Sequence, residues 1–158
     1  MPSNTFSALG LTEPLLRALE RERFVEPTSI QATAIPHLLA GRDLLGIAQT
    51  GTGKTAAFAL PILQHLLCAS VRPAHFATRA LILAPTRELA LQIEDTLRHL
   101  ASQQPLRIVA ILGGVSRFMQ VQRMRGGADI VVGTPGRVCD LMATGELKLD
   151  QVSQFRPG

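Results

Sequence analysis

The sequence predicts an α/β fold, in which a mainly parallel sheet is flanked by helices and organised around a phosphate-binding loop. Three observations support this. Several short apolar runs are continuous and not alternating, as in strands that are covered on both faces. Segments with apolar residues at helical spacing separate these runs, and strands that alternate with helices form parallel sheets. A glycine-rich stretch with a lysine lies between an apolar run and an alanine-rich segment.

Length and composition fit one globular domain. The chain has 158 residues, of which 46% are hydrophobic and 18% are charged, so it can bury a core and wholesale disorder is excluded. We expect residues 1–41 to form N-terminal helices that belong to one structural domain with residues 42–158. The formal net charge of +4 is compatible with a polyanionic partner, although ordinary proteins also reach it.

Cysteine usage and hydropathy predict a cytoplasmic protein with no membrane span. Cys68 and Cys139 lie far apart in the sequence and form no C-x-x-C motif, which favours reduced thiols and gives no metal site. The N-terminus lacks a basic region followed by an apolar one, as a secretory signal requires. The most apolar stretch, residues 56–67, is interrupted by proline and polar residues.

Two helices are expected before the glycine-rich stretch. Thr12, followed by Glu13 and Pro14, is typical of a helix start, and leucines follow at helical spacing. Thr28 and Gln31 have the spacing of a capping box, in which the Gln31 amide N–H donates to the Thr28 side chain and the Gln31 side chain reaches back. The second helix should therefore run to about residue 39.

The first strand is expected at residues 43–48, a continuous apolar run. A helix follows from Lys54 to about Cys68, despite Pro61. Three more buried strands are predicted at residues 80–84, 108–112 and 129–133. Helical spacing predicts helices at residues 87–102 and 117–124 between them.

Residues 46–55 have the properties of a phosphate-binding loop. Gly51 and Gly53 permit positive φ values and close approach of the backbone to an anion. Lys54 would reach the β- and γ-phosphates, and the Thr55 hydroxyl is placed to ligate a magnesium ion. Ala48 stands where the general pattern has glycine. The alternative is a Gly/Thr-rich turn with an incidental lysine, but the strand-loop-helix setting favours phosphate binding.

Small and polar residues follow each of the three later strands, at Pro85–Ala90, Gly113–Gly114 and Thr134–Arg137. Because the carboxyl ends of parallel strands meet at one edge of a sheet, these clusters should crowd together there with the phosphate loop. Hydroxyls, helix N-terminal amides, glycines and arginines suit a sugar-phosphate backbone. Taken singly, each cluster is explained equally well by helix caps and turns.

These motifs, in this order, resemble the first RecA-like domain of DEAD-box RNA helicases. Phe6 and Phe24–Gln31 are similar to the Q motif, with Arg23 where the family usually has glycine. Ala48–Thr55 matches motif I, including the alanine. The remaining matches are Pro85–Ala90 to motif Ia, Gly113–Gly114 to the GG element, and Thr134–Arg137 to motif Ib.

The resemblance implies ATP and Mg²⁺ as ligands and RNA as a partner, held by backbone contacts without sequence readout. Gln31 would pair with the adenine edge, supported by Phe6 or Phe24, although Phe24 fits core packing equally well. The implied nucleotide-binding residues are Phe6, Phe24, Thr28, Gln31, Thr50, Gly51, Thr52, Gly53, Lys54 and Thr55, with Thr55 holding Mg²⁺ through the nucleotide. The implied RNA-binding residues are Pro85, Thr86, Arg87, Gly113, Gly114, Thr134, Pro135, Gly136 and Arg137.

The sequence also lacks three features of the family, since it contains no Asp-Glu-Ala-Asp stretch, no Ser-Ala-Thr motif and no second RecA-like domain. We therefore expect a truncated helicase or excised fragment that binds ATP and RNA weakly, hydrolyses ATP negligibly and does not unwind RNA. We also expect unpaired sheet edges. The alternatives are a non-catalytic ATP- or RNA-binding module and a P-loop kinase or transporter ATPase.

Overall fold

The computed structural model describes residues 5–153, and its internal contacts divide the chain into two compact units. The first unit contains the described chain up to Ala69 together with His99–Gln103. The second contains Ser70–Arg98 and the described residues from Gln104 onward. The boundary expected after residue 41 stays a prediction.

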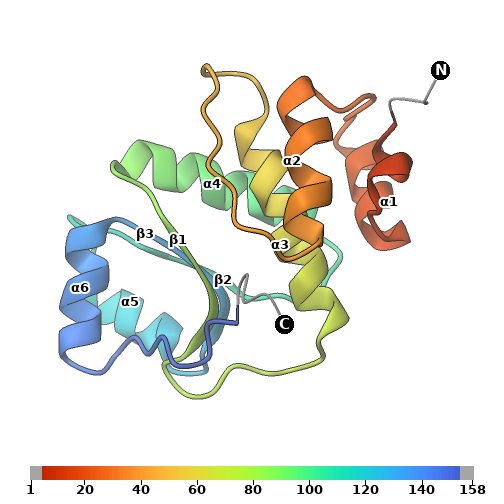
Figure 1. Ribbon diagram of the computed structural model, residues 1–158. Coiled ribbons are helices and arrows are strands. Elements are labelled where there is room, and N and C mark those ends of the chain that lie inside the picture. Colours follow the sequence, from red (N-terminus) through yellow and green to blue (C-terminus); the bar gives the residue numbers. More distant parts are fainter. Residues whose placement is uncertain (1–4, 154–158) are drawn as a thin grey trace. The chain divides into compact units, whose positions relative to one another are not determined.

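The first unit is helical (Figure 1). Its elements are the 3₁₀ helix η1 (Phe6–Leu9) and the α-helices α1 (Glu13–Arg21), α2 (Ser29–Leu39) and α3 (Lys54–Cys68). The capping box at the start of α2 is confirmed: the Gln31 N–H donates to Thr28 Oγ1 at 3.4 Å, and the Thr28 N–H donates to Gln31 Oε1 at 3.0 Å. The predicted helix bounds are confirmed to within a residue.

Helix α1 ends with Arg23 in a left-handed conformation. Its φ is 60°, a value that favours glycine. The Phe24 N–H donates to the Leu19 carbonyl at 2.9 Å, and the Arg23 N–H donates to the Glu20 carbonyl at 3.0 Å. This pair of bonds is a Schellman motif, whose left-handed residue is usually glycine. The motif gives a physical reason for the glycine that the family resemblance leads us to expect in place of Arg23.

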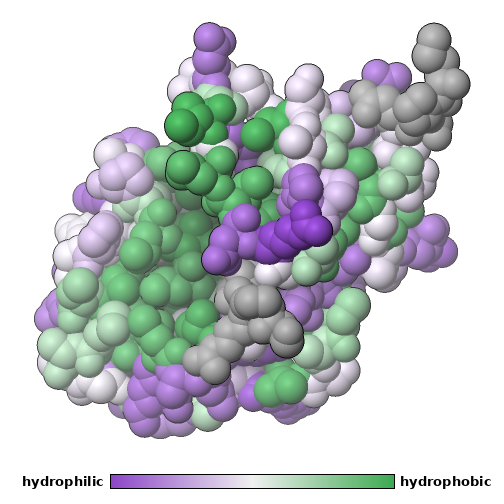
Figure 2. Space-filling model, viewed as in Figure 1, coloured by the Kyte–Doolittle hydropathy of each residue, from purple (hydrophilic) through white to green (hydrophobic). Residues whose placement is uncertain are grey.

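The strand predicted at residues 43–48 is absent, and this prediction was wrong. The segment between α2 and α3 has no regular structure, and Leu45 and Ile47 are 89% and 90% exposed. Figure 2 shows apolar surface over this segment. A strand needs a neighbour for its backbone N–H and C=O groups. Among the described residues no strand pairs with the segment, so its apolar composition alone does not make it a strand.

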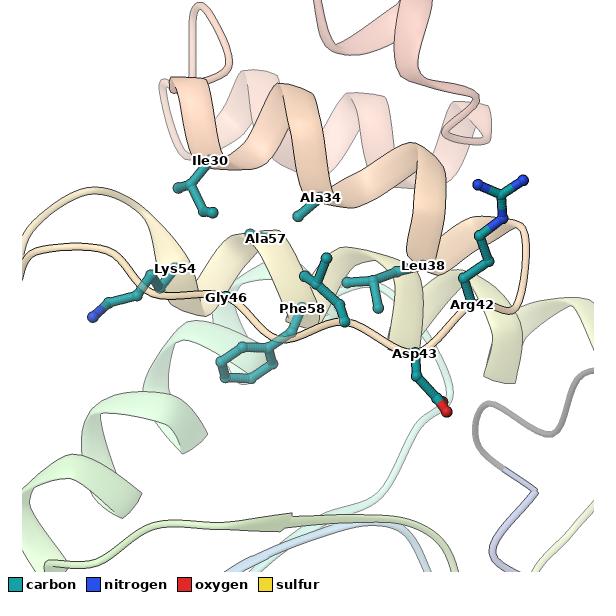
Figure 3. Close-up of a pocket in the computed structure, with 10 residues that line it drawn as sticks. Ile30, Ala34, Leu38, Arg42, Asp43, Gly46, Lys54, Ala57 and Phe58 are labelled. Carbon is teal, nitrogen blue, oxygen red and sulfur yellow. The ribbon is translucent and has the colours of Figure 1, made fainter.

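A cavity of about 470 Å³ lies beside this segment within the first unit. Figure 3 shows its lining, which comes from α2, α3 and the segment itself. Ala34, Leu38 and Phe58 make it largely apolar, with Lys54 at one end and Arg42 at the other.

The second unit has a three-stranded parallel sheet in the order β1-β3-β2. Its elements are β1 (Thr78–Leu83), α4 (Arg87–Leu100, the last two residues of which belong to the first unit), β2 (Ile108–Ile111), α5 (Arg117–Met124), β3 (Ala128–Gly133) and α6 (Pro135–Ala143). The three strands and the two intervening helices match the predicted ranges to within two residues. The predicted α/β class with a parallel sheet is confirmed.

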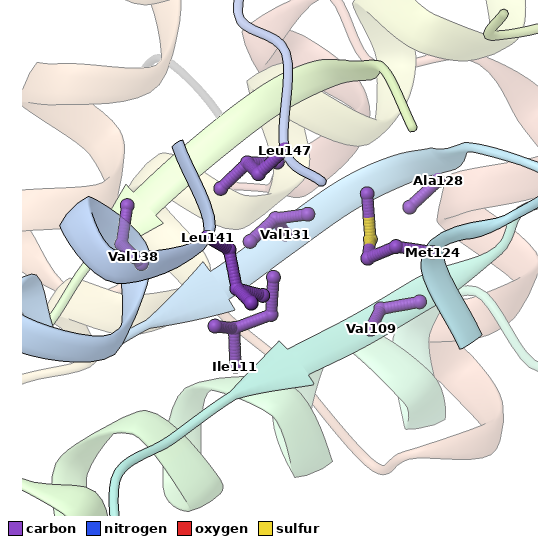
Figure 4. Close-up of a cluster of buried hydrophobic side chains, with 8 residues drawn as sticks. All are labelled: Val109, Ile111, Met124, Ala128, Val131, Val138, Leu141 and Leu147. Carbon is purple, nitrogen blue, oxygen red and sulfur yellow. The ribbon is translucent and has the colours of Figure 1, made fainter. Parts of the chain in front are cut away.

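The core of the second unit lies between the sheet and the helices α5 and α6, as Figure 4 shows. Its members are Val109, Ile111, Met124, Ala128, Val131, Val138, Leu141 and Leu147. In β3 the residues on the opposite face, Ile130 and Val132, are also fully buried. Burial on both faces is what the continuous apolar run predicted.

A buried ion pair fixes the start of β3 against β1. Arg79 Nη1 lies 3.0 Å from Asp129 Oδ1, with side-chain exposures of 6% and 9%. Asp129 Oδ2 also accepts the Arg107 N–H at 2.8 Å. Because both carboxylate oxygens have partners, the buried charge is compensated.

Residues 5–153 contain no helix long and apolar enough to cross a membrane. The same range holds no cluster of three potential metal-ligating side chains among His, Cys, Asp and Glu. Cys68 and Cys139 are both exposed and unpaired, as free thiols.

Candidate functional site

The glycine-rich loop turns sharply into α3. Gly51 and Gly53 have φ values of 77° and 82°, and Gly53 is the N-cap of α3. A side chain would be strained at both positions, as the sequence predicted. Lys54 is the first residue of α3, and its ammonium group donates to the Ala48 carbonyl at 2.5 Å. Lysine, glycines and helix N-terminus are thus brought together in one short turn.

Two side chains from the start of α2 hold the carbonyl groups of this loop. The Thr28 hydroxyl donates to the Thr52 carbonyl at 2.8 Å, and Gln31 Nε2 donates to the Gly53 carbonyl at 3.1 Å. In a trans peptide the C=O and the following N–H point in opposite directions. Fixing these carbonyls toward α2 therefore directs the N–H groups of Gly53 and Lys54 away from it. Two backbone donors, a helix N-terminus and an ammonium group fit a bound polyphosphate.

Both polar atoms of the Gln31 side chain have partners within the protein in this conformation. Its side chain is part of the capping box through Oε1 and of the loop contact through Nε2, and the residue is only 1% exposed. A Cβ built on Gly53 would lie 2.3 Å from Gln31 Nε2, so the close contact requires glycine there. The sequence predicted the capping box but gave no sign of the bond to Gly53.

Phe6 and Phe24 pack against each other edge to face, with ring centroids 6.3 Å apart and an interplanar angle of 76°. Phe6 is buried, and Phe24 is half-buried. Both line a cavity of about 340 Å³ together with residues of η1 and α1. The geometry is that of a packed aromatic pair. A role for either ring beside adenine stays a prediction.

Within the second unit, the three predicted clusters lie at one edge of the sheet. Leu83 of β1 and Ile111 of β2 both pair with Gly133 of β3, so the three strands end at the same level. The Thr134 N–H donates to the Ile111 carbonyl at 3.1 Å, and the Ala84 N–H donates to the Gly133 carbonyl at 2.9 Å. The convergence of these clusters is confirmed. Because the phosphate loop belongs to the other unit, its place beside this edge stays a prediction.

The two threonines at this edge behave differently. Thr86 Oγ1 accepts the Leu89 N–H at 3.2 Å, which caps α4, as the alternative interpretation had it. Thr134 is the N-cap residue of α6, but its hydroxyl makes no capping bond. Its neighbours Pro135 and Gly136 are exposed in the first turn of α6. The start of α6 therefore presents a hydroxyl and backbone amides that an anion could bind.

The two arginines at this edge also differ. Arg87 is exposed, and its guanidinium lies over Gly114: a Cβ on that glycine would be 2.6 Å from Arg87 Nη1. The Arg137 side chain instead makes hydrogen bonds within the protein. Its Nη1 donates to the Val115 carbonyl at 3.0 Å and to Gln120 Oε1 at 3.1 Å. Gln120, which is 2% exposed, was missed by motif reasoning. Its only signal in the sequence is a polar residue on the buried side of a short helix.

The chain is similar in sequence and in structure to proteins of one known family. A family model described as DEAD/DEAH box helicase matches residues 28–155. The chain is 47% identical over 150 residues to the ATP-dependent RNA helicase DeaD of Escherichia coli K12, covering 94% of this chain and 23% of that protein. It is 49% identical over 137 residues to the ATP-dependent rRNA helicase RRP3 of Meyerozyma guilliermondii, covering 87% of this chain and 28% of that protein.

A solved structure is also similar. The crystal structure of a DEAD box protein from the hyperthermophile Methanococcus jannaschii superposes with a TM-score of 0.82 at 37% sequence identity. The match covers 94% of this chain and 39% of that one. The chain thus spans about a quarter of the length of the curated relatives named above. With most of its length matched by the family model, the chain belongs to the DEAD/DEAH box helicase family.

Proposed function

We propose that this chain is the ATP- and RNA-binding N-terminal part of an ATP-dependent DEAD-box RNA helicase. The observation that carries the proposal is the loop at residues 50–54, where two left-handed glycines and two carbonyls anchored by Thr28 and Gln31 leave backbone donors available to an anion. Lys54 follows at the N-terminus of α3. Membership of the helicase family supports adenine nucleotides as the ligand.

Different residues of the loop would bind the phosphates and the magnesium ion. The amides of Gly53 and Lys54 and the Lys54 ammonium group would hold the phosphates, exchanging the bond to Ala48 for a phosphate oxygen. The Thr55 hydroxyl, in the first turn of α3, would hold Mg²⁺ through the nucleotide. Bound Mg²⁺ would neutralise part of the phosphate charge.

Gln31 would act on the nucleotide in two ways. It holds the loop through the Gly53 carbonyl, and we infer that it pairs with adenine when that bond is exchanged. A glutamine amide can donate to adenine N7 and accept from N6, while guanine offers acceptors at both positions. Preference for ATP over GTP would follow from this pairing.

The edge formed by the ends of β1, β2 and β3 would bind the backbone of RNA. Its support is the convergence of exposed Arg87, the glycine pair after β2 and the start of α6. Phosphate contacts from amides, hydroxyls and arginines position nucleic acid without reading its sequence.

We infer that these 158 residues bind without turnover. Phosphoryl transfer needs an aligned water and charge stabilisation beyond what Lys54 and Thr55 supply, and the sequence contains no Asp-Glu-Ala-Asp stretch. The same observation favours the second candidate, a non-catalytic ATP- or RNA-binding module. Magnesium-dependent phosphate release from ATP that Lys54→Ala abolishes would contradict this inference.

The free thiols support a cytoplasmic location.

Nucleotide binding tests the proposal, and the chain offers a matched control because its only lysines are Lys54 and Lys148. Calorimetry with Mg·ATP should show binding by the parent chain and by Lys148→Ala, which removes the same charge from an exposed site. Lys54→Ala should weaken binding at least tenfold, about 1.4 kcal/mol. Mg·GTP should bind more weakly than Mg·ATP.

Two outcomes would overturn the nucleotide assignment. One is an equal loss of affinity for Mg·ATP in Lys54→Ala and Lys148→Ala, which would show that the overall charge of the chain determines binding and the position of Lys54 does not. The other is equal affinity for ATP and GTP, because the adenine contact through Gln31 predicts discrimination between them.

A further inference from the structure

Gln120 of α5 bridges two segments of the proposed RNA-binding edge. Its Nε2 donates to the Leu112 carbonyl at 2.8 Å, immediately before Gly113. Its Oε1 accepts from Arg137 Nη1 at 3.1 Å, in the first turn of α6. The residue is 2% exposed, and its bond to Leu112 is buried while its bond to Arg137 is partly buried. A buried amide that lost them would be left unsatisfied, which proteins rarely tolerate.

Arg137 completes this bridge from the other side. Its Nη1 also donates to the Val115 carbonyl at 3.0 Å, and its Nε lies 3.7 Å from Asp140 Oδ2. Its side chain is only 17% exposed. The guanidinium group therefore points toward the protein, and a carboxylate neutralises part of its charge. An arginine that binds phosphate would instead present its N–H donors to solvent.

The loop between β2 and α5 depends on these bonds for its shape. It contains Gly113 and Gly114, and Gly114 has a φ of 73°. Glycines leave the unbound backbone many conformations. The carbonyls on the two sides of the glycine pair, at Leu112 and Val115, are held by Gln120 and Arg137 respectively.

Other contacts keep α5 in place independently of Gln120. Arg117 Nε donates to Asp140 Oδ2 at 3.0 Å, and Arg117 Nη1 donates to Glu146 Oε2 at 3.1 Å. The hydrogen bond to Asp140, with the nearby Glu146 charge, raises the pKa of Arg117 above its ordinary value. A change at Gln120 should therefore loosen the loop and leave the helix packed.

We propose that Gln120 is a positioning residue for RNA binding, and that Arg137 acts through the Gly113–Val115 loop and not as a phosphate contact. The inference rests on the RNA binding proposed above. It replaces the direct role that the family resemblance implied for Arg137. Arg87, whose guanidinium lies exposed over Gly114, is then the phosphate-contacting arginine of this edge.

Salt dependence separates the two roles. A side chain that neutralises a phosphate releases a counterion, so removing it lowers the slope of log K against log salt by about 0.7 for a single strand. A residue that only shapes the loop changes affinity equally at every salt concentration. The slope therefore distinguishes contact from positioning even where the loss of affinity is the same.

The experiment measures binding of a fluorescent oligouridine of about ten nucleotides to the full 158-residue chain. Salt is varied between about 50 and 200 mM. Gln120→Leu and Arg137→Met should each weaken binding about tenfold with an unchanged slope, and the double variant should be no weaker than either alone. Arg87→Met should weaken binding and lower the slope. Gln122→Leu, a half-buried glutamine of the same helix, should bind as the parent does.

A second variant covers the case in which Gln120→Leu does not fold. Arg137→Lys keeps the charge but loses the planar group that reaches both Val115 and Gln120. A positioning role predicts a loss close to that of Arg137→Met. Nearly full affinity in Arg137→Lys, or a lowered slope in Arg137→Met, would overturn the inference.

Hydrogen exchange in the absence of RNA separates failure of this inference from failure of the proposed function. Gln120→Leu should speed amide exchange at residues 113–116 relative to Gln122→Leu, whether or not RNA binds. If the parent chain binds RNA but Gln120→Leu changes neither exchange nor affinity, the inference is wrong and the proposed function stands. If the parent does not bind RNA, the RNA function fails, and the positioning role for binding fails with it.

Discussion

Arg23 shows how one residue departs from the expected chemistry without changing the fold. It occupies the left-handed position of the Schellman motif after α1, where a Cβ costs about 1–2 kcal/mol. The sequence has an arginine at the position where the family resemblance leads us to expect glycine. Only the backbone geometry explains what the glycine would do there.

Replacing Arg23 with glycine should therefore stabilise the chain. We expect Arg23→Gly to raise the free energy of unfolding by up to about 1 kcal/mol, because relief of strain exceeds the added entropy of the unfolded chain. Urea denaturation measures this change. Glu20→Gly, at an exposed position within α1, is the control and should lower the free energy of unfolding by about 1 kcal/mol. If both substitutions destabilise equally, the strain at Arg23 is absent.

At the scale of elements, local patterns predicted most of the structure. The strands β1, β2 and β3 and their intervening helices follow from apolar runs and helical spacing, which depend on neighbouring residues alone. The segment at residues 43–48 has the same kind of apolar run, yet Leu45 and Ile47 are exposed. A strand also needs a partner, and pairing is a non-local property that composition does not encode.

Hydrogen exchange should distinguish this segment from a true strand. Among the described residues, the backbone amides of residues 44–47 have no hydrogen-bond acceptor, whereas Val131 and Val132 lie in the central strand. We expect the former to exchange at nearly the rate of an unfolded peptide and the latter to be slower by orders of magnitude. Mass spectrometry of the exchanged peptides measures both. Comparable protection in the two peptides would show that the segment is paired in solution.

At the scale of the whole molecule, the two candidate binding regions belong to different compact units. The phosphate loop belongs to the first and the proposed RNA-binding edge to the second. The motifs predicted which residues would gather at each place. They did not predict that Gln31 would hold Gly53, or that Gln120 would hold Arg137, because both contacts join residues distant in sequence.

Each ligand should consequently protect its own unit. At a hundred times its dissociation constant, a ligand adds about 2.7 kcal/mol to the free energy of unfolding of what it binds. We expect Mg·ATP to slow exchange at residues 50–57 and oligouridine to slow it at residues 113–116 and 134–137. Lys54→Ala should remove the first effect and spare the second. Protection by Mg·ATP confined to the second unit would contradict the assignment of the loop.

The two exposed thiols suit this division. Cys68 lies at the end of α3 in the first unit, and Cys139 lies in α6 in the second. The unaltered chain therefore accepts a donor and an acceptor fluorophore, one on each unit. Energy transfer between the dyes would report whether nucleotide or RNA changes the distance between Cys68 and Cys139, and so between the two units.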